Sequence, residues 1–159
     1  RATGALVGEA AEAEVLAARL SEGVAAARRA SAALPRRPKV FFEEWDEPLI
    51  SGIRWVEELV EAAGGEPVFP ELREKGLAKD RIVTPAEVAR RAPDLIVASW
   101  CGKKANLAAI KRRAGWDKVP AVRSGMVREI KSTYILQPGP AALTEGLAQL
   151  QALIKEAAT

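Results

Sequence analysis

The 159 residues are 48% hydrophobic, which is enough apolar material for one well-buried core, so we expect a single domain. The 24 basic and 21 acidic residues are interspersed, which disfavours nucleic-acid binding, because the one basic cluster (Lys103, Lys104 and residues 111–113) falls on a predicted helix as its solvated face. The single cysteine excludes an internal disulfide, and the absence of histidine excludes Ser-His-Asp and Cys-His catalysis.

Two helices are predicted at the start of the chain. Residues 1–7 end one helix, which Gly8 terminates at the position after its last turn. The Ala-rich segment 9–33 then predicts a helix of about 25 residues, roughly 37 Å long at 1.5 Å per residue, which is more than a small α/β domain needs on its flank. The chain starts at Arg1 without methionine or signal peptide, so we interpret it as a processed product or a fragment.

From Pro38 onward, short apolar strands alternate with helices. Strands are predicted over 40–44, 67–69, 94–99, 121–123 and 127–130, and helices over 50–63, 84–92, 103–113 and 140–156. The second of these helices has a complete start signal: Thr84 caps it, Pro85 takes the first helical position and Glu87 completes a capping box. This alternation predicts an α/β fold, a Rossmann-like three-layer lobe with a mostly parallel sheet, preceded by the long helix.

Unusual residues gather directly after the predicted strands. These positions hold EEWDEP (43–48), FPE (69–71), WCGKK (100–104) and RSGM (123–126), with LQPGP (136–140) before the last helix. Open parallel sheets bind ligands outside the carboxyl ends of their strands. The sequence therefore predicts that this edge of the sheet faces a ligand.

Several of these side chains also have a purely structural interpretation. Trp45 and Trp100 either cap the core or contact a ligand, whereas Trp55 is expected to pack within its helix and Trp116 to anchor a loop. Cys101 is first a small buried residue, because a thiol nucleophile needs an activating base.

The sequence gives little support for an enzymatic function. Glu43, Glu44 and Asp46 offer an acid/base pair or a Mg²⁺ site, but adjacent acids on a strand point to opposite faces, so only one or two converge. No GxGxxG follows a strand, and CGKKAN (101–106) lacks the first glycine and the Ser/Thr of a phosphate-binding loop.

Three stretches together resemble the corrinoid-binding branch of the substrate-binding proteins of ABC importers, which are related to siderophore- and haem-binding proteins. They are VFFEEWDEPLISGIRWVEELVEAAGG (40–65), RIVTPAEVARRAPDLIVASWCGKK (81–104) and ILQPGPAALTEGLAQL (135–150). The resemblance implies two α/β lobes joined by one rigid helix, with the ligand between them. Residues 1–8 then end a missing N-terminal lobe, 9–37 form the connecting helix and 38–159 form the C-terminal ligand-binding lobe.

The resemblance also implies a function. The protein is expected to be a non-enzyme without cofactor that captures a corrinoid such as cobalamin and delivers it to the permease, in the periplasm or tethered outside the membrane. Aromatic contact and a few hydrogen bonds would hold the corrin. The residues expected to bind it are Glu44, Trp45, Asp46, Phe69, Trp100, Cys101, Gly102, Ser124, Gly125 and Gln137.

The expected permease contact departs from the family pattern. Relatives often carry a glutamate early in a surface helix of this lobe, and Ala86 stands at that position here. Docking therefore falls to Glu87, Glu71 or Glu74. Three alternatives remain open: a ferric-siderophore or haem carrier, a small Rossmann-like carboxylate or metal enzyme, and a fragment that self-associates through the exposed face of the long helix.

Overall fold

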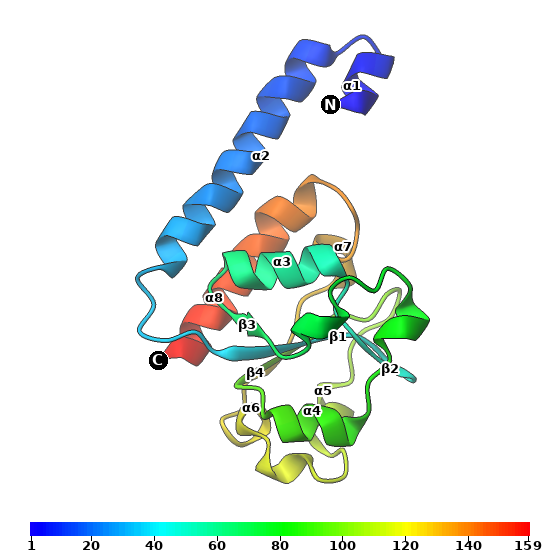
Figure 1. The fold of residues 1–159 in the computed structure, drawn as a ribbon, viewed down its shortest axis with the longest axis vertical. Helices are drawn as coiled ribbons and strands as arrows, with labels where there is room; N and C mark the ends of the chain where they lie inside the picture. The colour runs from blue at the N-terminus through cyan, green and yellow to red at the C-terminus, as the bar shows by residue number, and fades with distance from the viewer.

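A computed structural model describes residues 1–159 as a long helix followed by an α/β lobe (Figure 1). The chain begins with α1 (Ala2–Leu6) and α2 (Ala10–Ser31). The strands are β1 (Lys39–Asp46), β2 (Leu49–Ser51), β3 (Glu66–Pro67), β4 (Leu95–Ala98) and β5 (Val127–Glu129). The lobe's helices are α3 (Arg54–Ala62), α4 (Pro85–Arg91), α5 (Leu107–Lys111), α6 (Pro120–Arg123), α7 (Ser132–Ile135) and α8 (Leu147–Ala158), with 3-10 turns η1 (Pro70–Leu72), η2 (Ala78–Arg81) and η3 (Trp116–Lys118) and the π-helical turn η4 (Ala142–Gly146).

The strands form one sheet around β1. Its order is β2-β1-β4-β5, with β4 parallel to β1, β5 parallel to β4, and β3 parallel to the first residues of β1. The register pairs Glu43 with Ala98 and Ala98 with Glu129, so β4 and β5 end level with Glu43, and β1 runs on beyond them to Asp46. We call this side of the sheet the carboxyl edge. The predicted α/β class with a mostly parallel sheet is confirmed.

Helices cover both faces of the sheet. Figure 1 shows α3 and α8 on one face and α4, α5 and α6 on the other. Strand residues such as Phe41 and Ile96 are buried, as are Trp116 of η3 and Leu150 of α8. Each such side chain contributes about 1.5–3 kcal/mol when it leaves water, so these layers fix the carboxyl edge firmly.

The sequence predicts one helix over residues 50–63, but the structure has a strand and a shorter helix there. β1 continues to Asp46, and the chain returns as the antiparallel strand β2, so α3 starts only at Arg54. Glu43 pairs with Ser51 and Trp45 with Ile50, which leaves Glu44 as the extra residue of a β-bulge. The acidic, aromatic segment is therefore a bulged β-hairpin at the carboxyl edge.

The strand predicted over 121–123 is wrong. These residues belong to the short helix α6, which Pro120 starts at its first position. The amide of Ala121 donates to the Pro93 carbonyl rather than to a strand. Proline preorganises a helical first turn, and three apolar residues are too few to reveal periodicity.

The helix predicted over 103–113 is shorter than expected. Gly102 has a left-handed φ of +74°, and Asn106 caps α5 through its side chain, so the helix spans only Leu107–Lys111. Lys103 and Lys104 consequently lie in the loop after β4 rather than on a helix face.

Helix α2 projects beyond the lobe (Figure 1). Part of it contacts α3 and α8, and Ala27 is its one buried residue. Val15 is 71% exposed and Leu6 of α1 is 87% exposed. The chain thus presents an uncovered apolar surface at the far end of α2. None of its helices combines the length and apolar character needed to cross a membrane.

Candidate ligand-binding site

A pocket of about 450 Å³ opens at the carboxyl edge beside the β1–β2 hairpin. Residues of the hairpin, the start of α3, the loop after β4 and the end of α7 form its wall. They are Glu44, Trp45, Pro48, Ile50, Ile53, Trp55, Cys101 and Leu136, and we call this set the apolar pocket. Six of the eight are hydrophobic, and the volume lies within the roughly 300–1,000 Å³ typical of small-molecule sites.

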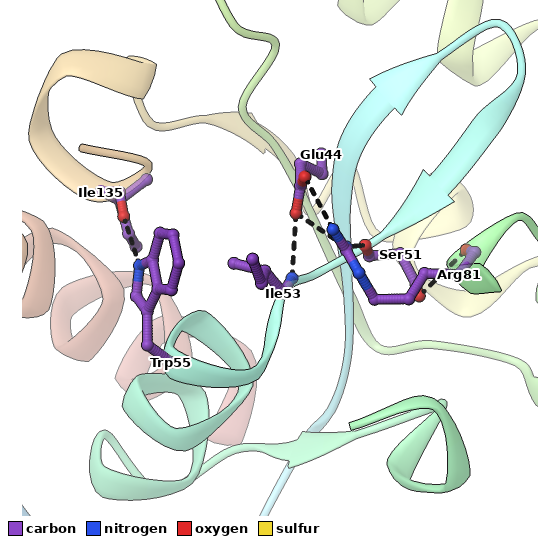
Figure 2. A network of polar contacts seen from close by, with 6 residues as sticks. All are labelled: Glu44, Ser51, Ile53, Trp55, Arg81 and Ile135. Atoms are coloured by element: carbon purple, nitrogen blue, oxygen red, sulfur yellow. Dashed lines mark hydrogen bonds and ion pairs between the residues drawn. The ribbon is translucent and has the colours of Figure 1, made fainter. Parts of the chain in front are cut away.

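The bulge places Glu44 in the pocket wall, where three groups hold its carboxylate (Figure 2). The amide of Ile53 donates to Oε2 at 2.9 Å, and Arg81 donates from Nη1 to Oε2 at 2.8 Å and from Nη2 to Oε1 at 3.0 Å. Arg81 is only 1% exposed and also donates to the Ser51 carbonyl. This cluster ties β1, β2, the start of α3 and η2 together, so the polar part of the wall is rigid.

Trp55, in the first turn of α3, forms another part of the wall. Its Nε1 donates to the carbonyl of Ile135 at 3.3 Å, which links α3 to α7 (Figure 2). Leu136, the next residue, lines the pocket beside it. The prediction that Trp55 is simply a packed residue of its helix is thus incomplete, because its half-buried indole also lines the pocket.

The ammonium group of Lys103 lies over the rings of both tryptophans at the carboxyl edge, Trp45 and Trp100. Its Nζ lies 4.2 Å from the ring centroid of Trp45 and 4.8 Å from that of Trp100, and 2.8 Å from Oδ1 of Asp46. The Trp45 Nε1 donates to the Glu47 carbonyl at 3.0 Å. Each cation–π contact is worth about 0.5–1 kcal/mol at such a site, so Trp45 is held in place at the pocket mouth.

The buried carboxylate of Glu43 binds the indole N–H of Trp100. Glu43 is fully buried and accepts hydrogen bonds from Trp100 Nε1 at 3.1 Å and from Arg113 Nη1 and Nη2 at 2.5 and 2.7 Å. Burial raises the pKa of Glu43, while Arg113 and Trp100 oppose that rise. Trp100 is itself 4% exposed, so it belongs to the core beneath Lys103 rather than to the pocket wall.

A second buried carboxyl, that of Glu57, lies in α3, two residues after the pocket-lining Trp55. Burial raises the pKa of Glu57 to about 8; Arg73 and Arg81 lower it, and Glu61 and Glu44 raise it further. At neutral pH this side chain is therefore largely protonated.

The carboxylates of the hairpin do not form one site. Glu43, Glu44 and Asp46 each bind a different basic side chain. No group of three potential metal-binding side chains comes together in the chain. Each of the three carboxylates is thus paired with its own cation, and the three do not converge on one point.

A family model described as "Periplasmic binding protein" matches residues 1–134. The chain belongs to the periplasmic binding protein family. Relatives of known structure include proteins titled as ABC-transporter substrate-binding, heme-binding and vitamin B12-binding proteins. The family model itself describes binding proteins rather than enzymes. A comparison with curated proteins found no match.

Solved structures share the fold at low identity. A possible iron-binding protein from Staphylococcus epidermidis ATCC 12228 has a TM-score of 0.80 at 22% identity, over 96% of this chain and 58% of that one. A periplasmic heme-binding protein from Roseiflexus sp. RS-1 gives 0.80 at 22%, over 98% and 60%. A periplasmic vitamin B12 binding protein of Vibrio cholerae gives 0.65 at 19%, over 86% and 51%. The present chain thus spans about 60% or less of these relatives.

The structure brings part of the predicted site of this binding protein together. Glu44, Trp45 and Cys101 line the apolar pocket. Asp46, Gly102 and Gln137 each adjoin a lining residue in the chain, and the last two are exposed. Trp100 is buried in the core beneath Lys103 and does not line the pocket. Pro48 and Leu136 also line the pocket and belong to segments predicted to face a ligand, whereas Ile50, Ile53 and Trp55 were not predicted.

Three predicted residues lie elsewhere. Phe69 is 4% exposed and packs edge-on against Phe41 at 5.8 Å, because β3 is too short to carry it to the carboxyl edge. Ser124 and Gly125 follow the misassigned strand and in fact precede β5, which places them at the opposite edge of the sheet. The structure therefore removes these three from the pocket.

The glutamates predicted to dock on a permease all have partners within the chain. Glu71 forms an ion pair with Arg91, and Glu74 with Arg54 at 3.0 Å. Glu87 forms the predicted capping box at the start of α4. Hydrogen bonds within this box lower the pKa of Glu87. Glu74 keeps the most exposed of the paired side chains, at 71%.

Proposed function

We propose that this periplasmic binding protein is the substrate-binding component of an ABC importer, and that its cargo is a corrinoid of the cobalamin type. The observation that carries the proposal is the apolar pocket, where the indoles of Trp45 and Trp55 stand beside the carboxylate of Glu44. A corrin is a broad, mostly apolar disc fringed with amides. Indole faces offer large contact area at low entropic cost. Glu44 already accepts three hydrogen bonds and retains capacity for one amide N–H.

The chain is proposed to supply one of two lobes. In this arrangement residues 1–8 end the other lobe, 9–37 connect the lobes and 38–159 bind one side of the ligand. Support comes from the projecting helix α2 with its uncovered apolar surface, and from the greater length of the structural relatives. Binding would take place outside the cytoplasm, in the periplasm or at a membrane anchor, and a single helix between the lobes would permit only small lobe motions.

Docking to the permease is proposed to use Glu71 and Glu74 rather than Glu87, because Glu87 is engaged in its capping box. Charge reversal at Glu74 should weaken the complex with the permease and leave ligand affinity unchanged. Equal loss of both would contradict a docking role.

A ferric-siderophore or haem cargo is the second candidate. The relatives from Staphylococcus epidermidis and Roseiflexus are titled as iron- and heme-binding proteins, and Tyr134 is a possible phenolate ligand for ferric iron. Tyr134 is 39% exposed on α7, but it does not line the apolar pocket, and the chain has no histidine. The geometry therefore favours the corrinoid.

Calorimetric titration of this chain with cyanocobalamin, haem and a ferric hydroxamate tests the proposal. We expect saturable heat with cyanocobalamin alone, which Trp45→Ala and Trp55→Ala each abolish. Val15→Ala, an apolar truncation at a 71% exposed position of α2, serves as the matched control and should bind as the parent does. Saturable binding of haem or the siderophore without cyanocobalamin binding would overturn the corrinoid assignment.

A further inference from the structure

A second cleft, of about 460 Å³, lies next to the apolar pocket and has a different character. No hydrophobic residue lines it. Its wall consists of Gly102, Lys103, Lys104, Glu129, Lys131, Ser132 and Thr133, and we call this set the basic cleft.

The same two segments of the chain contribute neighbouring residues to both cavities. The loop after β4 contributes Cys101 to the apolar pocket and the following three residues to the basic cleft. On the other side, Ser132 and Thr133 of α7 line the cleft, while Leu136 just after α7 lines the pocket. Lys103 spans the boundary, since its ammonium lies over the indole of Trp45. A ligand seated in the pocket therefore has its edge beside the cleft.

The cleft has uncommitted positive charge. Lys103 is paired with Asp46, and the carboxylate of Glu129 accepts the amide of Ala105 at 2.8 Å. Lys104 and Lys131 are exposed and have no carboxylate within ion-pair distance, so two ammonium groups remain free.

The hydroxyls of Ser132 and Thr133 make no hydrogen bond within the chain. Two cations and two free hydroxyls facing one cleft match an anion with several oxygen acceptors, such as a phosphodiester. The neutral amides at the edge of a corrin ring carry no charge that Lys104 and Lys131 would pair with.

We infer that the basic cleft is an anion subsite, in which Lys104 and Lys131 bind the phosphodiester of the cargo while the apolar pocket holds its disc. This inference rests on the proposed function and narrows the substrate class to complete corrinoids, whose nucleotide loop carries a phosphate, over precursors that lack the loop. Lys103 is not expected to bind the phosphodiester directly, because its ammonium group is already paired with Asp46 and lies over the indoles of Trp45 and Trp100.

The expected effect is moderate because the lysines are solvated. Exposed charge pairs are weak, so removing both charges should weaken binding only about tenfold. Salt screens such contacts over about 10 Å at 0.1 M ionic strength, so the effect should shrink as salt rises.

The test compares two corrinoids on the same proteins. Cyanocobalamin carries the phosphodiester, and dicyanocobinamide has the corrin ring without the nucleotide loop. Each is titrated calorimetrically into the parent chain, the double variant Lys104→Gln/Lys131→Gln, and the control Lys155→Gln on α8, with circular dichroism to verify the fold. The quantity of interest is the ratio of parent to variant affinity for each ligand, which cancels intrinsic differences between the two corrinoids.

We expect the double variant to bind cyanocobalamin about tenfold more weakly and dicyanocobinamide as the parent does, with no change for Lys155→Gln. A double variant that changes neither affinity, or both by the same factor, would overturn the anion subsite and leave the corrinoid function standing. Failure of both corrinoids to bind the parent chain would overturn the proposed function and the subsite with it.

Discussion

The Glu44–Arg81 pair gives the sharpest stability prediction for the pocket wall. Glu44→Ala removes both oxygens that Arg81 contacts, at 2.8 and 3.0 Å, and leaves a guanidinium that is 1% exposed without its counter-charge. Breaking a buried pair from one side costs about 3–5 kcal/mol. The Glu44 side chain is 19% exposed, which admits some water, so we expect about 3 kcal/mol, the low end of that range.

Urea unfolding followed by tryptophan fluorescence measures this loss in a double-mutant cycle. Arg81→Met alone leaves Glu44 with the Ile53 amide and should cost less, and the double variant should be no less stable than Glu44→Ala, because the orphaned charge is gone. Glu58→Ala, which breaks an exposed pair with Arg54, is the control and should cost about 0.3–0.5 kcal/mol. Additive losses in the double variant, or a cost below about 1 kcal/mol for Glu44→Ala, would refute the reasoning.

Three further predictions concern other parts of the lobe. The raised pKa of Glu57 contributes stability that is complete below pH 4.5 and is lost as the pH rises toward about 8, so Glu57→Gln should flatten the pH dependence of the urea midpoint over that interval; an unchanged profile would contradict the assignment. Gly65→Ala would place a methyl group 2.8 Å from Val40 Cγ2 and should destabilise by about 1–3 kcal/mol, whereas Gly23→Ala on the open face of α2 should not; equal midpoints for the two variants would argue against the close packing. Alkylation of the exposed thiol of Cys101 by iodoacetamide should slow when cyanocobalamin is bound, and equal rates would place the ligand elsewhere.

Local signals in the sequence were sufficient for much of the fold. Thr84, Pro85 and Glu87 specify a helix start through side-chain-to-backbone hydrogen bonds, and the structure contains that capping box. The apolar run 94–99 predicts a buried central strand, and β4 lies there. Such features depend on neighbours in the chain, so they can be recognised without tertiary structure.

The wrong predictions concern segments whose secondary structure depends on contacts with distant parts of the chain. Nothing local distinguishes Leu49–Ser51 as a strand from the first turn of a helix, because its ladder partners lie across a hairpin. Once that hairpin forms, its bulge aims Glu44 into the pocket, and α3 starts later and presents Trp55. The order of side chains after a predicted strand was likewise misleading for Ser124, because the strand itself was absent.

The four indole N–H resonances offer the most direct test of the corrinoid site, since each tryptophan has a distinct place in the lobe. Cyanocobalamin should be titrated into ¹⁵N-labelled chain to millimolar concentration, a range in which weak binding by one lobe still shifts peaks. The account predicts movement of Trp45 and Trp55, which line the apolar pocket, and a stationary peak for Trp116, whose Nε1 donates to the Pro85 carbonyl in the core. Four unmoved indole peaks, or shifts confined to Trp100 and Trp116, would contradict it.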